Sequence, residues 1–202
     1  MRLVHHRALA ARRGFTLAEL LAVVAMIGTL AAVAAPGFVQ LLRDQRVQRS
    51  AKNLAEFYRV ARSQAVARGV ASLVHWDKGG GWTSGKGQLE IREAVLPGND
   101  WPSQSCLTTN WANGANTNRL ISRIEPEFGL YELATVDAFD PANNAVNQLD
   151  VCFTPRGRTF FSVNNGPLVV LNGVPRLVVK NSRSGYLRTL FIPPNGVARL
   201  EL

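Results

Sequence analysis

Histidine and cysteine, the residues that most often hold metals or act as bases and nucleophiles, are scarce in this chain. Only three histidines and two cysteines occur among its 202 residues. His5 and His6 lie near the amino terminus, far from His75, so a zinc site or a catalytic triad built on several histidines is excluded. Cys106 and Cys152 lack Cys-x-x-Cys spacing, which leaves a dithiol redox motif without support.

Glycine-rich phosphate loops are also absent. The glycines at 79–81 precede Trp82 rather than a helix, so they do not form a P-loop or a dinucleotide-binding turn. Glu125 and Glu127 flank Pro126 and are most simply solvated carboxylates of a turn. The sequence contains no internal repeat. We therefore predict no enzymatic activity and no cofactor.

Charge is missing from one long stretch of the chain. Residues 20–42 contain no charged side chain, and 23 residues suffice to cross a bilayer, which needs about 20. Glu19 stands alone just before this apolar run. Because a carboxylate within a bilayer costs about 2.5–3.5 kcal/mol on insertion scales, such an acid indicates a function that involves a partner. The preceding residues 1–14 contain no acid and four arginines, at positions 2, 7, 12 and 13.

The stretch Gly14-Phe15-Thr16-Leu17-Ala18-Glu19-Leu20-Leu21, followed by Pro36, resembles the cleavage and methylation site of type IV pilins and pseudopilins. The resemblance implies that a prepilin peptidase cuts after Gly14 and methylates the new amino group of Phe15. It further implies that Glu19 neutralises an N-terminal ammonium in the assembling fibre. The apolar helices of the subunits would then pack together as the fibre core, with the globular domains outside.

Two other interpretations of the amino terminus remain open. An ordinary secretory signal peptide would have a basic start, an apolar core and a small-residue cleavage site such as Ala32-Val33-Ala34. The position of Glu19 inside the apolar core and of Pro36 behind the cut argue against it. A plain membrane anchor is the second interpretation, and it is compatible with a pilin-like subunit that waits in the membrane before assembly.

Net charge depends on whether the first fourteen residues are retained. The chain carries 23 basic and 14 acidic residues, a formal charge of +9. Residues 1–14 hold four of the basic residues and no acid, so the charge falls to +5 without them. Such a surface could meet DNA or anionic lipid, although a solvated basic face is the commoner explanation.

Hydrophobic periodicity predicts one long helix over residues 16–68, interrupted at Pro36-Gly37 by a kink or a locally melted turn. Residues 15–42 form its apolar part and residues 43–69 its amphipathic part, with Gly69 as the stop signal. The apolar face of the second part is Val47, Ala51, Leu54, Tyr58, Ala61 and Ala65. The opposite face carries Arg49, Lys52, Glu56 and Arg59.

Residues 70–202 change to short β-like runs separated by turn residues, which predicts an antiparallel β domain. The fold class is therefore α+β, a long N-terminal helix packed on an antiparallel sheet or sandwich. The expected strands are 70–76, 89–91, 119–124, 130–136, 149–153, 159–163, 168–171, 176–180, 186–192 and 197–202. Residues 97–118 are expected to be a surface loop, whose Trp101 and Trp111 either bind a ligand or cover a sheet end.

Cys106 and Cys152 are the only cysteines, and in an extracytoplasmic protein such a pair predicts one disulfide. The alternative is two buried thiols. A bridge would tie the expected loop to a strand of the β domain.

The β domain resembles the GspH/FimT family of minor pilins and pseudopilins, through Ala65–Gly69, Phe153–Gly157 and Pro194–Leu200. The resemblance implies a structural subunit of a type IV pilus or a type II secretion pseudopilus, held in the bacterial inner membrane before assembly. Its partners would be prepilin peptidase and other pilins. Some FimT-like members bind DNA through a Gly-Arg-x-Arg element, which here reads Gly196–Arg199 and lacks one arginine. Arg183, Arg188 and Arg199 are the candidate phosphate-binding residues of this alternative.

Overall fold

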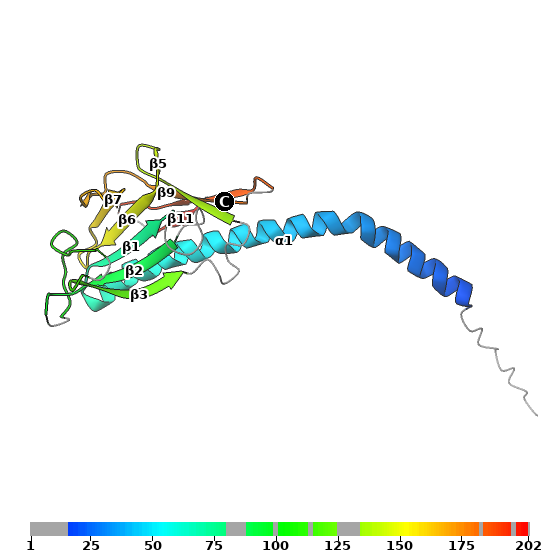
Figure 1. Cartoon of the computed structure of the whole chain (residues 1–202), viewed down its shortest axis with the longest axis horizontal. Helices are drawn as coiled ribbons and strands as arrows, with labels where there is room; N and C mark the ends of the chain where they lie inside the picture. The colour runs from blue at the N-terminus through cyan, green and yellow to red at the C-terminus, as the bar shows by residue number, and fades with distance from the viewer. Residues whose placement is uncertain are drawn as a thin grey trace, which may run out of the picture. The chain divides into compact units, whose positions relative to one another are not determined.

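The computed structural model describes residues 16–79, 88–98, 101–112, 115–124, 134–181, 184–194 and 197–201. The chain forms two compact units, Met1–Leu41 and Leu42–Leu202. One helix, α1 (Leu17–Arg68), belongs to both units, and the strands all belong to the second (Figure 1). The α+β fold predicted from the sequence is confirmed.

A side-chain cap sets the first residue of α1, and a glycine sets its last. Thr16 and Glu19 form a reciprocal capping box at the start, in which the Glu19 amide donates to the Thr16 hydroxyl at 3.2 Å and the Thr16 amide donates to the Glu19 carboxylate at 2.9 Å. At the other end Gly69 adopts a φ of 66°, the left-handed conformation that glycine accepts without strain. The helix remains α-helical across Pro36, so the locally melted turn is absent from it. A proline removes a single backbone donor, and the neighbouring turns retain theirs.

The strands form two antiparallel sheets. The six-stranded sheet has the order β3-β2-β1-β6-β7-β8, and the five-stranded sheet has the order β11-β10-β9-β4-β5. The first sheet consists of β1 (Ser72–Asp77), β2 (Gln88–Ala94), β3 (Asn118–Ile124), β6 (Gln148–Phe153), β7 (Thr159–Val163) and β8 (Val169–Val170). The second consists of β4 (Ala134–Phe139), β5 (Ala145–Val146), β9 (Arg176–Asn181), β10 (Leu187–Phe191) and β11 (Arg199–Leu200).

Most expected strands begin and end within two residues of the observed ones, and two differ more. The strand expected at 89–91 is observed as β2, which runs three residues farther, to Ala94. The strand expected at 130–136 is observed as β4, which runs to Phe139, and residues 130–133 lie outside the described part. β5 was not expected, because two residues are too few for an alternating pattern to stand out. The turn after β7 has its left-handed residues at Asn164 and Asn165, with φ of 49° and 60°. The Asn164 side chain accepts hydrogen bonds from the amides of Asn147 and Gln148, which fixes that position.

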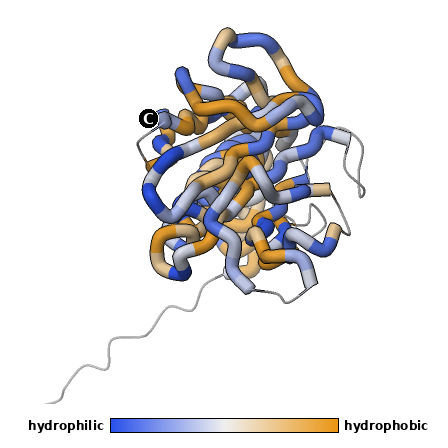
Figure 2. The backbone as a smooth tube through the Cα atoms, turned by 90° about the vertical axis from the view of Figure 1, so that its left-hand side faces the viewer, coloured by the Kyte–Doolittle hydropathy of each residue, from blue (hydrophilic) through white to orange (hydrophobic). Residues whose placement is uncertain are grey.

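The main core joins the amphipathic half of α1 to the inner faces of both sheets. All six residues of the predicted apolar face are buried, and they pack with Trp76 and Ile91 of the first sheet and Leu177 of the second. Hydrophobic and hydrophilic stretches interleave along the strands (Figure 2), as expected where one face of each strand is buried. The predicted basic face is exposed, with Arg49, Lys52, Glu56 and Arg59 all in solvent.

A second, smaller core lies on the outer face of the six-stranded sheet. It contains Leu73, Ala94 and Phe160 and is covered by the segment 101–112. Cys106 of that segment is bonded to Cys152 of β6, so the predicted disulfide is confirmed. The Trp111 indole donates to the Cys106 carbonyl at 2.9 Å and packs on this cluster. Trp111 therefore covers the sheet, whereas Trp101 is 66% exposed.

Candidate functional site

The first candidate is the apolar half of α1. Every residue from Leu17 to Leu42 is exposed, including leucines, valines, isoleucine and phenylalanine. The helix is long and apolar enough to cross a membrane. An exposed apolar surface of this extent is not stable in water, so another apolar phase or another protein surface must cover it. Pro36 lies within this half, and Gly14 and Phe15 lie outside the described residues.

Glu19 occupies the first turn of this half. Its carboxylate accepts hydrogen bonds from the Thr16 amide at 2.9 Å and the Thr16 hydroxyl at 3.0 Å. Those bonds give the residue a local role as a helix cap, which is independent of its charge because a glutamine at this position caps equally well. The structure thus separates two properties of Glu19, its capping hydrogen bonds and its negative charge.

The arginines proposed for DNA binding do not share one face. Arg199 pairs with Phe191 across β10 and β11. Arg188 lies three residues before Phe191, and successive side chains of a strand point to opposite faces, so Arg188 and Arg199 point to opposite sides of the sheet. Arg188 instead stacks on the ring of Tyr186, at 5.0 Å from its centroid. Arg183 lies outside the described residues.

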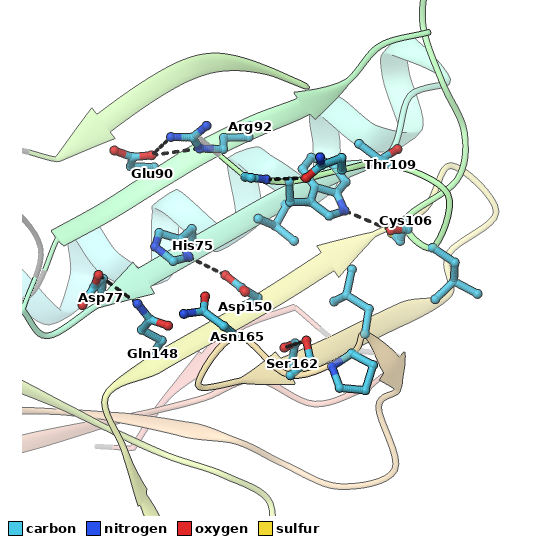
Figure 3. Close-up of a pocket in the computed structure, with 18 of the residues that line it drawn as sticks. His75, Asp77, Glu90, Arg92, Cys106, Thr109, Gln148, Asp150, Ser162 and Asn165 are labelled. Atoms are coloured by element: carbon cyan, nitrogen blue, oxygen red, sulfur yellow. Dashed lines mark hydrogen bonds and ion pairs between the residues drawn. The ribbon is translucent and has the colours of Figure 1, made fainter. Parts of the chain in front are cut away.

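The second candidate was not predicted from the sequence. A groove of about 940 Å³ lies on the outer face of the six-stranded sheet, between the segment 106–112 and the turn 165–168 (Figure 3). Its floor is polar, although the sheet's inner face is apolar. One row of side chains crosses five strands in register, in the order Arg123, Glu90, His75, Asp150 and Ser162.

Two arginines, Arg92 and Arg123, surround the carboxylate of Glu90 at one end of this row, which we call the positive end. The side chains of Glu90 and Arg92 are only 5% and 7% exposed, and the Arg92 guanidinium contacts the Glu90 carboxylate at 2.9 and 2.6 Å. Arg123 adds two contacts to the same carboxylate, at 2.8 and 2.7 Å. Burial alone would raise the pKa of Glu90, but the hydrogen bonds and charges of these two arginines outweigh it and lower the pKa.

His75 and Asp150 form the negative end, together with Asp77. The His75 Nδ1 atom lies 2.5 Å from an Asp150 carboxylate oxygen. Burial alone would lower the pKa of His75. The hydrogen bond to Asp150 and the charges of Asp150, Glu90 and Asp77 outweigh burial and raise that pKa. Gln148 donates to Asp77 at 3.1 Å, so an amide also lines this end.

The groove does not have the geometry of a serine hydrolase. In a Ser-His-Asp triad the histidine stands between the other two, but here Asp150 stands between His75 and Ser162. The Ser162 hydroxyl donates to the Gly166 carbonyl at 2.6 Å. Among the described residues no group of three or more histidine, cysteine or acidic side chains could hold a metal ion. The arrangement is suited to binding.

Sequence reasoning noted His75 only as an isolated histidine in a strand. Two local signals were present, because Gln88, Glu90 and Arg92 alternate along one strand and Gln148 and Asp150 along another. Alternation places each set on one face, but only the pairing of β1 with both strands brings the two sets together.

Neither a family model, nor a curated protein, nor a solved structure matches this chain.

Proposed function

We propose that this chain is a minor pilin or pseudopilin, a structural subunit of a type IV pilus or a type II secretion pseudopilus. Prepilin peptidase cleaves it after Gly14, and the subunit waits in the bacterial inner membrane before it assembles with other pilins. The observation that carries the proposal is the contrast within α1, whose half Leu17–Leu42 is exposed and apolar, with Glu19 as its one charged residue, while the rest of the helix is packed on a β domain.

The exposed half of α1 has an apolar surface that must be covered both in the membrane and in a fibre. In the membrane, lipid covers its apolar surface, and in a fibre the same surface is covered by the equivalent helices of other subunits. The exchange leaves the apolar surface buried throughout, so the subunit moves from lipid into the fibre without exposing it to water. The β domain, held by its own core, remains folded in both states.

Glu19 gives the assembly its register. Once Gly14 is removed, the amino group of Phe15 is a cation near the start of an apolar helix. A carboxylate of a neighbouring subunit stabilises that cation, and an unpaired charge in such a setting is strongly unfavourable. The pair therefore forms only when the helices are aligned so that the two groups meet.

The test uses the distinction between capping and charge. Glu19→Gln retains the capping hydrogen bonds and removes the negative charge, so we expect normal cleavage and normal accumulation in the membrane but little incorporation into sheared fibres or crosslinked assemblies. Thr16→Ala is the matched control, because it removes the capping hydroxyl and retains the charge of Glu19. That control is expected to assemble.

Normal incorporation of the Glu19→Gln subunit would overturn the proposed role of the charge. Loss of assembly in Thr16→Ala together with normal assembly of Glu19→Gln would show that the helix cap, not the charge, is what assembly needs. Because the register of β10 and β11 separates Arg188 from Arg199, we do not propose the DNA-binding alternative.

A further inference from the structure

The groove on the six-stranded sheet has no role in assembly through α1. Its floor is the sheet face opposite to the one that packs on the amphipathic half of α1, since His75 alternates with Val74 and Trp76 of the main core. If α1 lies inside a fibre, as the proposed function requires, this face points outward. A molecule outside the fibre can therefore reach the groove.

The charges in the groove are graded from one side to the other. At the β2–β3 side, Arg92 and Arg123 both contact the carboxylate of Glu90. Among the described residues, the carboxylates of Asp77 and Asp150 at the β1–β6 side face one titratable cation, His75. With His75 neutral this side carries an excess of two negative charges, and with His75 protonated it carries an excess of one.

The length of the row suits an extended chain. Four steps between adjacent strands, at about 4.8 Å each, separate Arg123 from Ser162 by roughly 19 Å. An extended peptide of about six residues, at about 3.3 Å per residue, has that length. The rim adds groups that can contact a peptide backbone and its apolar side chains, because Asn165, Asn110 and Gln148 carry amides and Leu107 and Leu168 are apolar.

We propose that this groove binds an extended peptide segment of a partner protein, with a lysine or arginine side chain of that segment placed against Asp77 and Asp150. Charge complementarity selects the occupant. A cation compensates the excess negative charge of the β1–β6 side, and the arginines of the β2–β3 side disfavour a second cation there.

His75 makes the interaction sensitive to pH. It faces Asp150 on β6, Glu90 on β2 and Asp77 on its own strand, while Arg92 and Arg123 lie beyond Glu90. Protonated His75 compensates part of the negative charge that the incoming cation needs. Because the neighbouring carboxylates raise the pKa of His75, we expect peptide affinity to increase as the pH rises through that value.

The experiment titrates the full chain in detergent micelles with three capped peptides, Ala-Ala-Lys-Ala-Ala-Ala and its versions with Gln or Glu in place of Lys, by isothermal calorimetry. We expect the lysine peptide to bind about tenfold more tightly than the glutamate peptide, with the glutamine peptide between them. Asp150→Asn is expected to reduce that preference, because only the carboxylate of Asp77 then remains at this side. Glu56→Gln is the matched control, since it removes the same charge from the exposed face of α1 and should change nothing.

Asp77→Asn provides a second variant should Asp150→Asn fail to fold, because Asp77 ends β1 and its side chain contacts only Gln148 and the Gly79 amide among the described residues. Equal affinity for the three peptides, tighter binding of the glutamate peptide, or no binding of the lysine peptide at concentrations up to about 10 mM would overturn the inference. It rests on the proposed function only for the outward placement of the groove. The titration uses unassembled protein, so its failure is distinguishable from failure of the Glu19→Gln fibre assay.

Discussion

The two halves of α1 are both rich in apolar residues and differ in where those residues find contacts. In the first half Leu30 is 71% exposed, and in the second half Leu54 is fully buried against the β domain. The first half therefore does not bury its apolar surface within its own chain, whereas the second half does. One continuous helix thus contains a half packed in the main core and a half that is exposed.

The largest expected effect tests this contrast directly. Leu54→Ala should lower the free energy of unfolding of the β domain by about 2–5 kcal/mol, because it leaves a cavity in the main core. Leu30→Ala removes the same atoms from an exposed position and should leave that free energy unchanged. Thermal unfolding of the full chain in detergent, followed by near-ultraviolet circular dichroism of the buried Trp76, measures both. A similar loss of unfolding free energy in the two variants would contradict the difference in burial between the two halves of α1.

Removing the disulfide should affect the β domain and leave the apolar half of α1 unchanged. The bridge joins residues 46 apart in sequence. Replacing Cys106 and Cys152 together by serine should destabilise the β domain by about 2–4 kcal/mol. Because both residues belong to the second unit, incorporation of the apolar half of α1 into membranes should not change. Unfolding midpoints and membrane fractionation, compared with the unreduced wild type, test the two statements. A double variant as stable as the wild type would contradict the first.

The smallest expected effect concerns pH. The folded-state pKa of His75 is raised above its unfolded value, so protonation favours the folded domain. This contribution is fully present below the unfolded value of about 6.5 and is lost as the pH rises through the folded-state pKa. The stability difference between wild type and His75→Gln should therefore shrink from about pH 5 to about pH 8. A difference that is constant across this range would contradict the charge interaction with Asp150.

Sequence patterns predicted the parts of the fold that depend on near neighbours. The face of α1 from Val47 to Ala65 and its stop at Gly69 follow from spacing and from single-residue chemistry. Thr16 and Glu19 also have the Thr-x-x-Glu spacing that is typical of a capping box. The resemblance to pilins predicts a role only for the charge of Glu19.

The groove could not be predicted in the same way. Its residues come from five strands, and Arg123 and Ser162 are brought into one row only by the strand order β3-β2-β1-β6-β7. That order requires β6 to pair with β1 after the chain has already formed β4 and β5 of the second sheet, which no local pattern indicates. The same reason explains Arg188 and Arg199, whose closeness in sequence suggested a shared patch until the register of β10 and β11 separated them.

The central claim is that α1 is an assembly helix whose mature chain begins at Phe15, and the intact mass of the membrane-extracted protein tests it most directly. The account predicts a mass that corresponds to residues 15–202 with one added methyl group and with the Cys106–Cys152 bridge intact. A chain that begins at Ala35 or Pro36 would instead show an ordinary secretory signal peptide. It would remove Glu19 and the whole apolar half of α1 up to that point from the mature protein, and would contradict the account.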